Sequence, residues 1–380
     1  MDTSREQLLE LIRCGLWTTD PDLSLFEVGV DWDRVLRLAC EQTVSGIIYP
    51  VIEKLPSSLR PSRSSTLRLH QLILLNKQHR SCHVVVASRV CELLRGAGIT
   101  CTVLLKGVGV GANYPDPSLR QCGDVDIFVG EEFYLLAMEF LSLEFALGDI
   151  DTSNDQHFDF EYMQTHIEIH RWVTSPKGVA YRGREFIRWS ESQLTSDRVR
   201  RVVVDGAELT LPPLDFDFIY IFYHTWRHFL VGGVGFRQFC DWCRLVYTFS
   251  QEFDRDEICR LIAYFRLETP IAIFSTIAVE VLGLDPSRLP CYRPVSPRLM
   301  HKALLKVWEG GNFGFYRPER KSPSRTVLHR KWCSFRILVS NMRFMLSIDW
   351  VYALRFYRGA FSRSIRASFK QFKTLNRKLS

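Results

Sequence analysis

Apolar residues recur three and four positions apart over much of the chain, which is the pattern of amphipathic helices. We expect helices over residues 4–14, 32–54, 66–95, 131–145, 215–231, 236–249, 255–266 and 270–282. Asp31 is a suitable N-cap for the second of these helices, and Gly46 and Pro50 are expected to break it. Gly96 and Gly98 are expected to end the third.

Shorter segments are continuously apolar or alternate between apolar and polar residues, as strands do. We expect strands over residues 102–105, 124–129, 158–163 and 166–172, and a hairpin that pairs 199–204 with 207–211. Asp205-Gly206 lies between the hairpin strands and is a strong turn signal. Strands with helical stretches before and after them predict an α+β fold with a small mixed β-sheet.

The same pattern divides the chain into four parts. We expect an N-terminal helical region over residues 1–98, a strand-rich core over 99–212 and a helical region over 213–300. A basic C-terminal helical segment over 301–380 completes the chain.

The composition is that of an ordinary globular protein: of 380 residues, 46% are apolar and 24% are charged. Residues 1–25 contain acidic side chains and lack the apolar stretch of a signal peptide. The longest apolar run, residues 271–284, is too short to span a bilayer. We therefore expect a cytoplasmic protein with no transmembrane segment.

Cysteines are numerous, with 11 in the chain, and without an export signal we expect them to be reduced. Cys240 and Cys243 form a C-x-x-C pair inside a helical pattern, with no second pair at zinc spacing. We interpret them as core cysteines rather than as a redox or metal site.

The net charge of +7 is concentrated at one end of the chain. Residues 320–380 contain 15 Lys and Arg and one acidic residue, Asp349, interleaved with aromatic residues. This pattern is typical of a surface for an anionic partner, either nucleic acid or a membrane surface. It also fits a helix that packs an apolar face on the core and exposes a basic one.

The strand at 124–129 contains the most informative polar residues. Asp124 and Asp126 are two positions apart, so both side chains point to one face of the strand. Adjacent carboxylates repel each other unless a cation lies between them. Mg²⁺, which proteins hold through one or two carboxylates plus substrate phosphates, fits this pair.

A glycine turn precedes this strand. Lys106, Gly107 and Gly109 follow the first strand, and small residues there allow a phosphate to approach backbone N–H groups. The spacing also fits a dinucleotide-binding fingerprint, but Pro115 and Pro117 end any helix too soon for a parallel crossover. The G-x-x-x-x-G-K-[ST] phosphate loop is absent.

Glu168 lies on a later strand, where His166, Glu168 and His170 share one face. With Asp124 and Asp126 it makes a platform for two metal ions, which suits in-line phosphoryl transfer. The same three residues of the later strand also suggest an alternative, a hydrolase with a transition metal held by His166, Glu168 and His170.

Two residue pairs share a helix face further along the chain. His224 and His228 have a metal-ligand spacing, but Thr225 stands where a metalloprotease has Glu, so we interpret them as polar residues that line a site or a helix interface. Arg237 and Asp241 are expected to form an ion pair.

These residues together resemble the uncharacterised nucleotidyltransferase family of the DNA polymerase β-like superfamily. The resemblance covers most of residues 30–250 and rests on Leu105-Lys106-Gly107, Tyr114, Arg120, Gly123-Asp124-x-Asp126 and Glu168-Ile169-His170. The superfamily often has Gly-Gly or Gly-Ser after the first strand, where this chain has Gly107-Val108.

The resemblance implies a nucleotidyltransferase core at 99–212 that moves an NMP from an NTP to an acceptor and releases pyrophosphate. Asp124, Asp126 and Glu168 would be catalytic and would hold two Mg²⁺ ions, or Mn²⁺ in their place. The residues expected to bind substrate are Lys106, Gly107, Arg120 and His170. Arg120 has a second interpretation, in which it neutralises Asp124. The acceptor is not identified, and a non-catalytic nucleotide-binding or scaffold protein is the remaining alternative.

Overall fold

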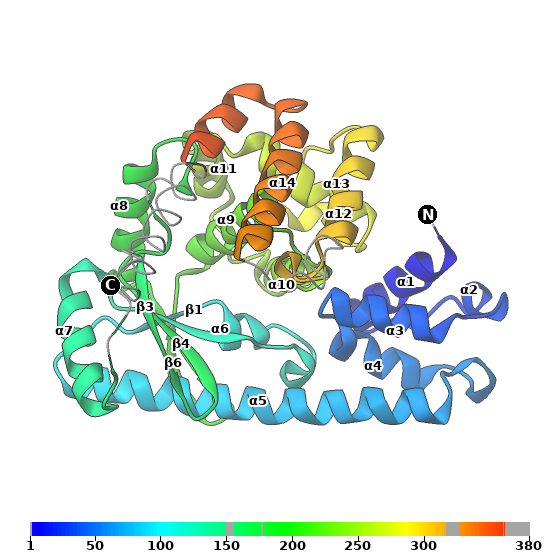
Figure 1. The fold of residues 1–380 in the computed structure, drawn as a ribbon, viewed down its shortest axis with the longest axis horizontal. Coiled ribbons are helices and arrows are strands. Elements are labelled where there is room, and N and C mark those ends of the chain that lie inside the picture. The colour runs from blue at the N-terminus through cyan, green and yellow to red at the C-terminus, as the bar shows by residue number, and fades with distance from the viewer. Residues whose placement is uncertain are drawn as a thin grey trace.

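The computed structural model describes residues 2–148, 150, 156–175, 178–316, 327–359 and 361. Its elements form an α+β protein in which a small sheet lies between helical regions (Figure 1). The predicted fold class is therefore confirmed. Within the described ranges, no helix is both long enough and apolar enough to cross a membrane.

The N-terminal region is helical, as predicted, and lies at one end of the molecule (Figure 1). Its elements are α1 (Thr3–Trp17), α2 (Ser24–Glu27), α3 (Trp32–Glu41), α4 (Ser45–Lys54) and the 3-10 helix η1 (Ser57–Leu59). Asp31 caps α3 as expected, accepting a hydrogen bond from the N–H of Arg34. The predicted break at Gly46 and Pro50 is wrong: the helices separate over residues 42–44, and both residues lie within α4.

Gly46 instead permits a close backbone contact. A Cβ atom on Gly46 would lie 1.8 Å from the carbonyl oxygen of Leu119, in the 3-10 helix η2 (Pro117–Leu119). We expect Gly46→Ala to lower the free energy of unfolding by about 2–3 kcal/mol, because α4 and η2 must move apart. Urea denaturation measures this loss. Gly96→Ala is the matched control, since its Cβ meets nothing within 4 Å; equal losses in both variants would contradict this explanation.

Helix α5 (Arg63–Gly96) is the longest described helix and runs beneath both the N-terminal helices and the sheet (Figure 1). Ser62 caps its start by accepting from the N–H of Ser65. After α5, Gly98 adopts a φ of +83°, a conformation that favours glycine. The apolar face of α5 packs on the sheet, so the helix fixes the sheet relative to the N-terminal region.

The sheet has four strands in the order β1-β2-β4-β3. They are β1 (Val103–Leu105), β2 (Asp124–Phe128), β3 (His157–Tyr162) and β4 (Thr165–His170). Strand β2 is antiparallel to β1 and parallel to β4, and β3 is antiparallel to β4, so the sheet is mixed as predicted. Helices α5 and α7 (Gly130–Glu144) bury the apolar face, and the polar face is turned toward the later helices.

A hairpin and a set of helices follow the sheet. Strands β5 (Arg200–Val204) and β6 (Ala207–Leu211) pair across Asp205-Gly206, both with positive φ, as predicted. Helix α8 (Gly183–Leu194) was not anticipated. The remaining helices are α9 (Leu214–Val231), α10 (Phe236–Phe249), α11 (Arg255–Tyr264), α12 (Glu268–Glu280), α13 (Pro297–Gly310) and α14 (Val327–Leu346), with short helices α6 (Gly107–Gly111), η4 (Pro286–Arg288) and η5 (Asn312–Gly314).

One expectation about the cysteines is wrong. Cys259 and Cys291 form a disulfide, with Cα atoms 6.0 Å apart, so the chain does not hold 11 reduced thiols. These cysteines are 32 positions apart, and no sequence motif indicates that they meet. Cys240 and Cys243 are free and fully buried, which confirms that they are core residues.

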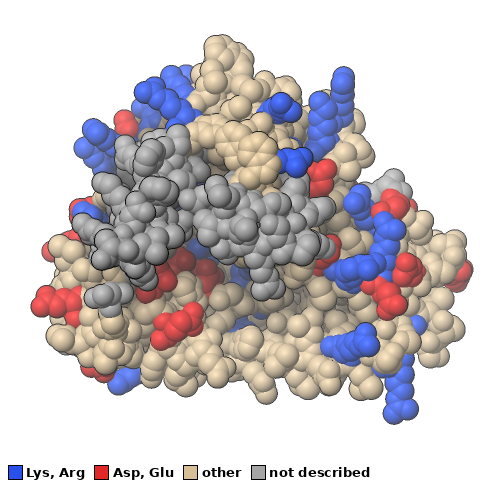
Figure 2. Space-filling view, viewed as in Figure 1, with Lys and Arg blue, Asp and Glu red and all other residues tan. Residues whose placement is uncertain are grey.

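Most of the basic residues of the C-terminal segment lie outside the described ranges, so its anionic partner stays a prediction. Elsewhere on the face shown in Figure 2, Lys and Arg side chains are spread over the helical regions rather than gathered in one continuous patch.

Candidate active site

The three predicted carboxylates lie together on the polar face of the sheet. In the parallel pairing of β2 with β4, Asp126 is directly opposite Glu168 and Asp124 is opposite His166. The apolar residues that alternate with them are packed against α5 and α7, which turns the carboxylates toward the other side. The Asp126 side chain is completely buried, and that of Glu168 is 20% exposed.

Lys106 supplies the positive charge at the centre of this group. Its Nζ lies 2.8 Å from Oδ1 of Asp126, and the chain turns sharply there, with φ of +48° at Lys106 and +50° at Gly107. Although burial acts to lower it, the pKa of Lys106 is raised by Asp126, with contributions from Asp124 and Glu168. The ammonium group is thus the cation that adjacent carboxylates require.

His170 connects two of the carboxylates. Its Nε2 lies 2.9 Å from Oδ1 of Asp126 and 3.2 Å from Oε2 of Glu168. Burial opposes the charged form, but these hydrogen bonds raise the pKa of His170 to about 9. In turn, despite burial, His170 lowers the pKa of Glu168 to about 2. His170 is therefore a protonated residue that orients both carboxylates.

One oxygen in this group has no partner. Oδ2 of Asp126 is buried and accepts no hydrogen bond from any residue that the structure describes. Leaving a buried carboxylate oxygen without a partner costs folding free energy. Coordination of a hard divalent cation would satisfy this oxygen. The unpartnered Oδ2 of Asp126, with Glu168 opposite it on β4 and Asp124 two positions before it on β2, is suited to a divalent metal ion.

The histidine-flanked alternative is different from the one expected. Ligand atoms of His157, Glu168 and His170 lie within 4.8 Å of one another, so His157 takes the place expected for His166. The antiparallel pairing of β3 with β4 sets His157 beside His170. His166 is instead on the exposed part of the strand, 3.1 Å from Glu161. The predicted set of His166, Glu168 and His170 is wrong in this one member.

Arg120 is held by a partner that was not expected. Its guanidinium donates to both oxygens of Asp241, at 3.0 and 2.7 Å, and to Sγ of Cys122 at 3.0 Å. Tyr114 also donates to Asp241, at 2.8 Å. The structure therefore pairs Arg120 with Asp241 rather than with Asp124. Arg237 does contact Asp241, as predicted, but at 3.6 Å.

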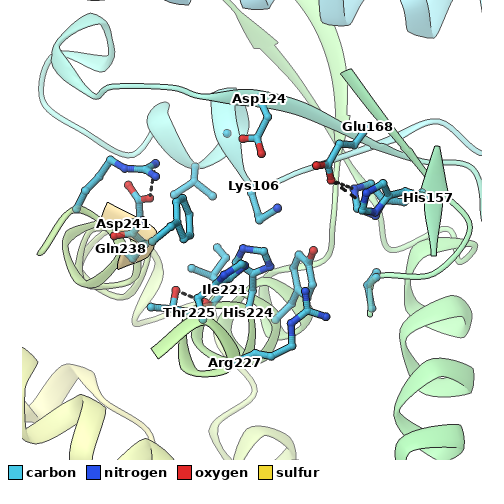
Figure 3. Close-up of a pocket in the computed structure, with 18 of the residues that line it drawn as sticks. Lys106, Asp124, His157, Glu168, Ile221, His224, Thr225, Arg227, Gln238 and Asp241 are labelled. Carbon is cyan, nitrogen blue, oxygen red and sulfur yellow. Dashed lines mark hydrogen bonds and ion pairs between the residues drawn. The ribbon is translucent and has the colours of Figure 1, made fainter. Parts of the chain in front are cut away.

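A cavity of about 300 Å³ separates the polar face of the sheet from α9, α10 and η5. In Figure 3, Asp124, Lys106 and Glu168 point into it from one side. Ile221, His224, Thr225 and Arg227 face them from α9 (Figure 3). The cavity is large enough for part of a nucleotide, and Asp124 and Glu168 lie on one of its walls.

His224 and His228 line this cavity with their rings 4.5 Å apart, which confirms that they are residues of a site wall. Burial and nearby cations lower the pKa of both well below the usual value, so both are neutral. Phe313 packs against His228 at 4.7 Å, with a φ of +49° between two glycines of positive φ.

Sequence reasoning missed several residues of the lining, among them His157, Tyr220, Arg227 and Phe313. Only His157 had a usable signal, because residues 157, 159 and 161 alternate as polar positions on the strand that precedes β4. The others come from helices whose distance from the sheet is set by tertiary packing.

A small mixed sheet with two carboxylates on one strand and a third on its parallel neighbour defines a nucleotidyltransferase core. The sequence model of a family described as uncharacterised nucleotidyltransferase matches residues 29–283. The match spans more than half of the chain, and the chain belongs to this family, as its sequence motifs indicated. No curated protein and no solved structure gives a significant match.

Membership indicates nucleotidyltransferase activity in general terms, and enzymes of this kind typically use divalent metal ions. The matched range contains β1, β2, β4 and the carboxylates, together with α9 and α10 across the cavity. Both walls of the site, apart from η5, therefore lie within the range that the family model matches.

Proposed function

We propose that this chain is a Mg²⁺-dependent nucleotidyltransferase, able to use Mn²⁺, that transfers an NMP from an NTP to a hydroxyl or phosphate acceptor. The observation that carries the proposal is the position of Asp124 and Glu168 on one wall of a cavity, with Asp126 directly opposite Glu168 in the strand pairing behind them. Arg227 on α9 and Arg237 on α10 supply cationic side chains to the opposite wall. The cavity therefore suits a metal-bound polyphosphate.

Asp124, Asp126 and Glu168 would hold the metal, with Asp126 contributing its unpartnered Oδ2. The metal, when bound, neutralises phosphate charge and makes the acceptor oxygen a better nucleophile. An acceptor oxygen forms a bond to the α-phosphorus while the bond to the bridging oxygen breaks, and pyrophosphate leaves with the electron pair. Glu168 would also accept the acceptor's proton in this scheme, from the position in which its contact with His170 holds it.

Gly107 allows a phosphate to lie close to the backbone, because it has no side chain and its φ is positive. His170 supports substrate binding by fixing two of the metal-binding carboxylates. The acceptor class is open and includes a sugar phosphate, a small alcohol, a protein hydroxyl and a nucleic acid end. Base preference is open as well.

Binding of the common NTPs, measured by calorimetry with Mg²⁺ and with EDTA, tests the proposal. We expect at least one NTP to bind, and its affinity to depend on Mg²⁺, because the carboxylates repel a free polyphosphate. A folded wild-type protein that binds no NTP in either condition would overturn the proposal.

Lys106 and a metal ion compete for the same carboxylates. The Lys106 ammonium already neutralises Asp126 through Oδ1, so it lies beside an ion bound at Oδ2 and repels it. We expect Lys106→Met to raise the affinity for Mn²⁺ without nucleotide by roughly 10- to 100-fold, because a like charge has been removed from the site. Manganese EPR titration measures this directly.

Lys106→Arg is the matched variant, since it keeps the charge and is expected to keep the weaker affinity of the wild type. A second readout is the melting temperature in EDTA, which should fall in Lys106→Met because Asp126 loses its closest cation. Unchanged Mn²⁺ affinity in Lys106→Met would show that the Lys106 ammonium does not oppose metal binding by these carboxylates.

A further inference from the structure

Two buried arginines and one buried carboxylate form the end of the cavity next to α10. Arg120, Arg237 and Asp241 all line the cavity, and their side chains are 3%, 11% and 7% exposed. This group carries one more positive charge than negative charge. Charges that are removed from water require a partner of opposite sign, so the excess must be balanced by a neighbouring group or by a ligand.

Asp241 is fully used by other residues. Arg120 donates to both of its oxygens, and Tyr114 donates to Oδ1 as well. Nη1 of Arg237 lies farther from this carboxylate, 3.6 Å from Oδ2 of Asp241. It also donates one long hydrogen bond, 3.4 Å, to the carbonyl oxygen of Gln121. Arg120 is therefore the more closely paired arginine, and the ion pair of Arg237 with the same carboxylate is longer, at 3.6 Å.

The surroundings of Arg237 reinforce this difference. Burial and the neighbouring Arg120 both lower its pKa, which shows that its charge is poorly compensated. Asp241 acts in the other direction, followed by Cys122 and Asp124, so Arg237 also experiences the field of the carboxylate wall. A polyphosphate held at Asp124 through a metal ion would lie between Asp124 and Arg237.

Three backbone N–H groups at this end of α10 already have partners and do not compete with Arg237 for an anion. The N–H groups of Phe236 and Arg237 donate to the side chain and the backbone carbonyl of Gln42, and the N–H of Gly235 donates to Gln238. The start of the helix is thus already capped. These three N–H groups are therefore not available to an anion, whereas the guanidinium group of Arg237 is part of the cavity lining.

We infer that Arg237 is the residue that binds the phosphates of the leaving group, in the role that the sequence suggested for Arg120. The inference rests on the proposed function and assigns a phosphate subsite within it. A guanidinium group binds two phosphate oxygens at once through parallel N–H groups, which suits a diphosphate that must be held as it leaves. Arg120 would then act indirectly, by occupying Asp241 and leaving Arg237 available.

The test uses inorganic tripolyphosphate with Mg²⁺, measured by calorimetry on the full chain. We expect Arg237→Met to weaken tripolyphosphate binding by about 10- to 100-fold, the effect of losing charged hydrogen bonds to phosphate. Arg237→Lys, which keeps the charge but not the bidentate geometry, should fall between Arg237→Met and the wild type. Arg260→Met is the control, because it removes the same charge from a 73% exposed position on α11 and should change affinity less than twofold.

Arg237→Met is expected to fold, since the Arg120–Asp241 pair remains intact, and its melting temperature verifies this. The inference is overturned if tripolyphosphate binds Arg237→Met within twofold of wild type, if Arg227→Met loses affinity and Arg237→Met does not, or if the wild type does not bind it. Arg237-dependent tripolyphosphate binding without binding of any NTP would support the phosphate subsite and reject nucleotidyl transfer. The two proposals therefore fail separately.

Discussion

Asp124→Asn/Asp126→Asn is expected to weaken Mg²⁺-dependent NTP binding by at least about 100-fold. Both substitutions keep the size of the side chain and remove the negative charge that a divalent cation needs. The buried Asp126 contributes an oxygen with no protein partner, and Asp124 shares its face of β2. Calorimetry with the NTP that binds the wild type measures the loss.

Asp159→Asn/Glu161→Gln is the matched control, because it removes two carboxylates from exposed positions on β3, an edge strand of the same sheet. We expect this variant to bind as the wild type does. Asp124→Asn alone leaves the buried Asp126–Lys106 contact in place, so it provides a second, folded variant that should still lose at least about tenfold in affinity. Full affinity in this single variant and in the double variant would remove the metal role of the pair.

Asp241→Asn is expected to lower the free energy of unfolding by about 3–5 kcal/mol. The substitution removes the negative charge between Arg120 and Arg237 and leaves two buried guanidinium groups without a carboxylate. Breaking a buried pair costs more than the pair contributes, because the remaining charge is uncompensated. Urea denaturation followed by circular dichroism measures the difference.

The control for this prediction is Arg260→Met, which breaks an exposed pair with Glu257 on α11. Exposed pairs contribute little, so we expect a change below about 1 kcal/mol. Similar losses in Asp241→Asn and Arg260→Met would contradict the structural role of the buried group.

The Asp241 contribution also depends on pH. Despite burial, Arg120 holds the pKa of Asp241 below its ordinary value, so the folded protein keeps this carboxylate ionised more readily than the unfolded chain does. The stability it adds is fully present above the unfolded pKa of about 4 and is lost as the pH falls through the lower, folded pKa. Asp241→Asn should therefore lose less stability on acidification than the wild type.

The strands and the shared face of the candidate carboxylates were predictable because they depend on local pattern. A period of two on β2 sets Asp124 and Asp126 on one face, and the same period on β4 sets Glu168 on its polar face. Neither conclusion needs information from distant parts of the chain. The parallel register that brings Glu168 opposite Asp126 was not predicted and comes from the structure.

The contacts that were not predictable join distant residues. Arg120 and Asp241 are 121 positions apart, and their pairing depends on how α10 docks against the sheet. The exchange of His166 for His157 follows from the pairing of β3 with β4, which sequence spacing alone does not set. Gly46 looked like a helix break but is a contact point for η2, because tertiary packing outweighed its local propensity.

The most direct test of nucleotidyl transfer is to identify which phosphate bond is broken. ³¹P NMR follows an NTP and Mg²⁺ with the wild-type protein and a set of acceptors that includes sugar phosphates, alcohols, protein hydroxyls and nucleic acid ends. Our account predicts pyrophosphate and an NMP-modified acceptor from the wild type, and neither product from Asp124→Asn/Asp126→Asn. Release of orthophosphate in place of pyrophosphate would mean that the β–γ bond is cleaved, and would contradict it.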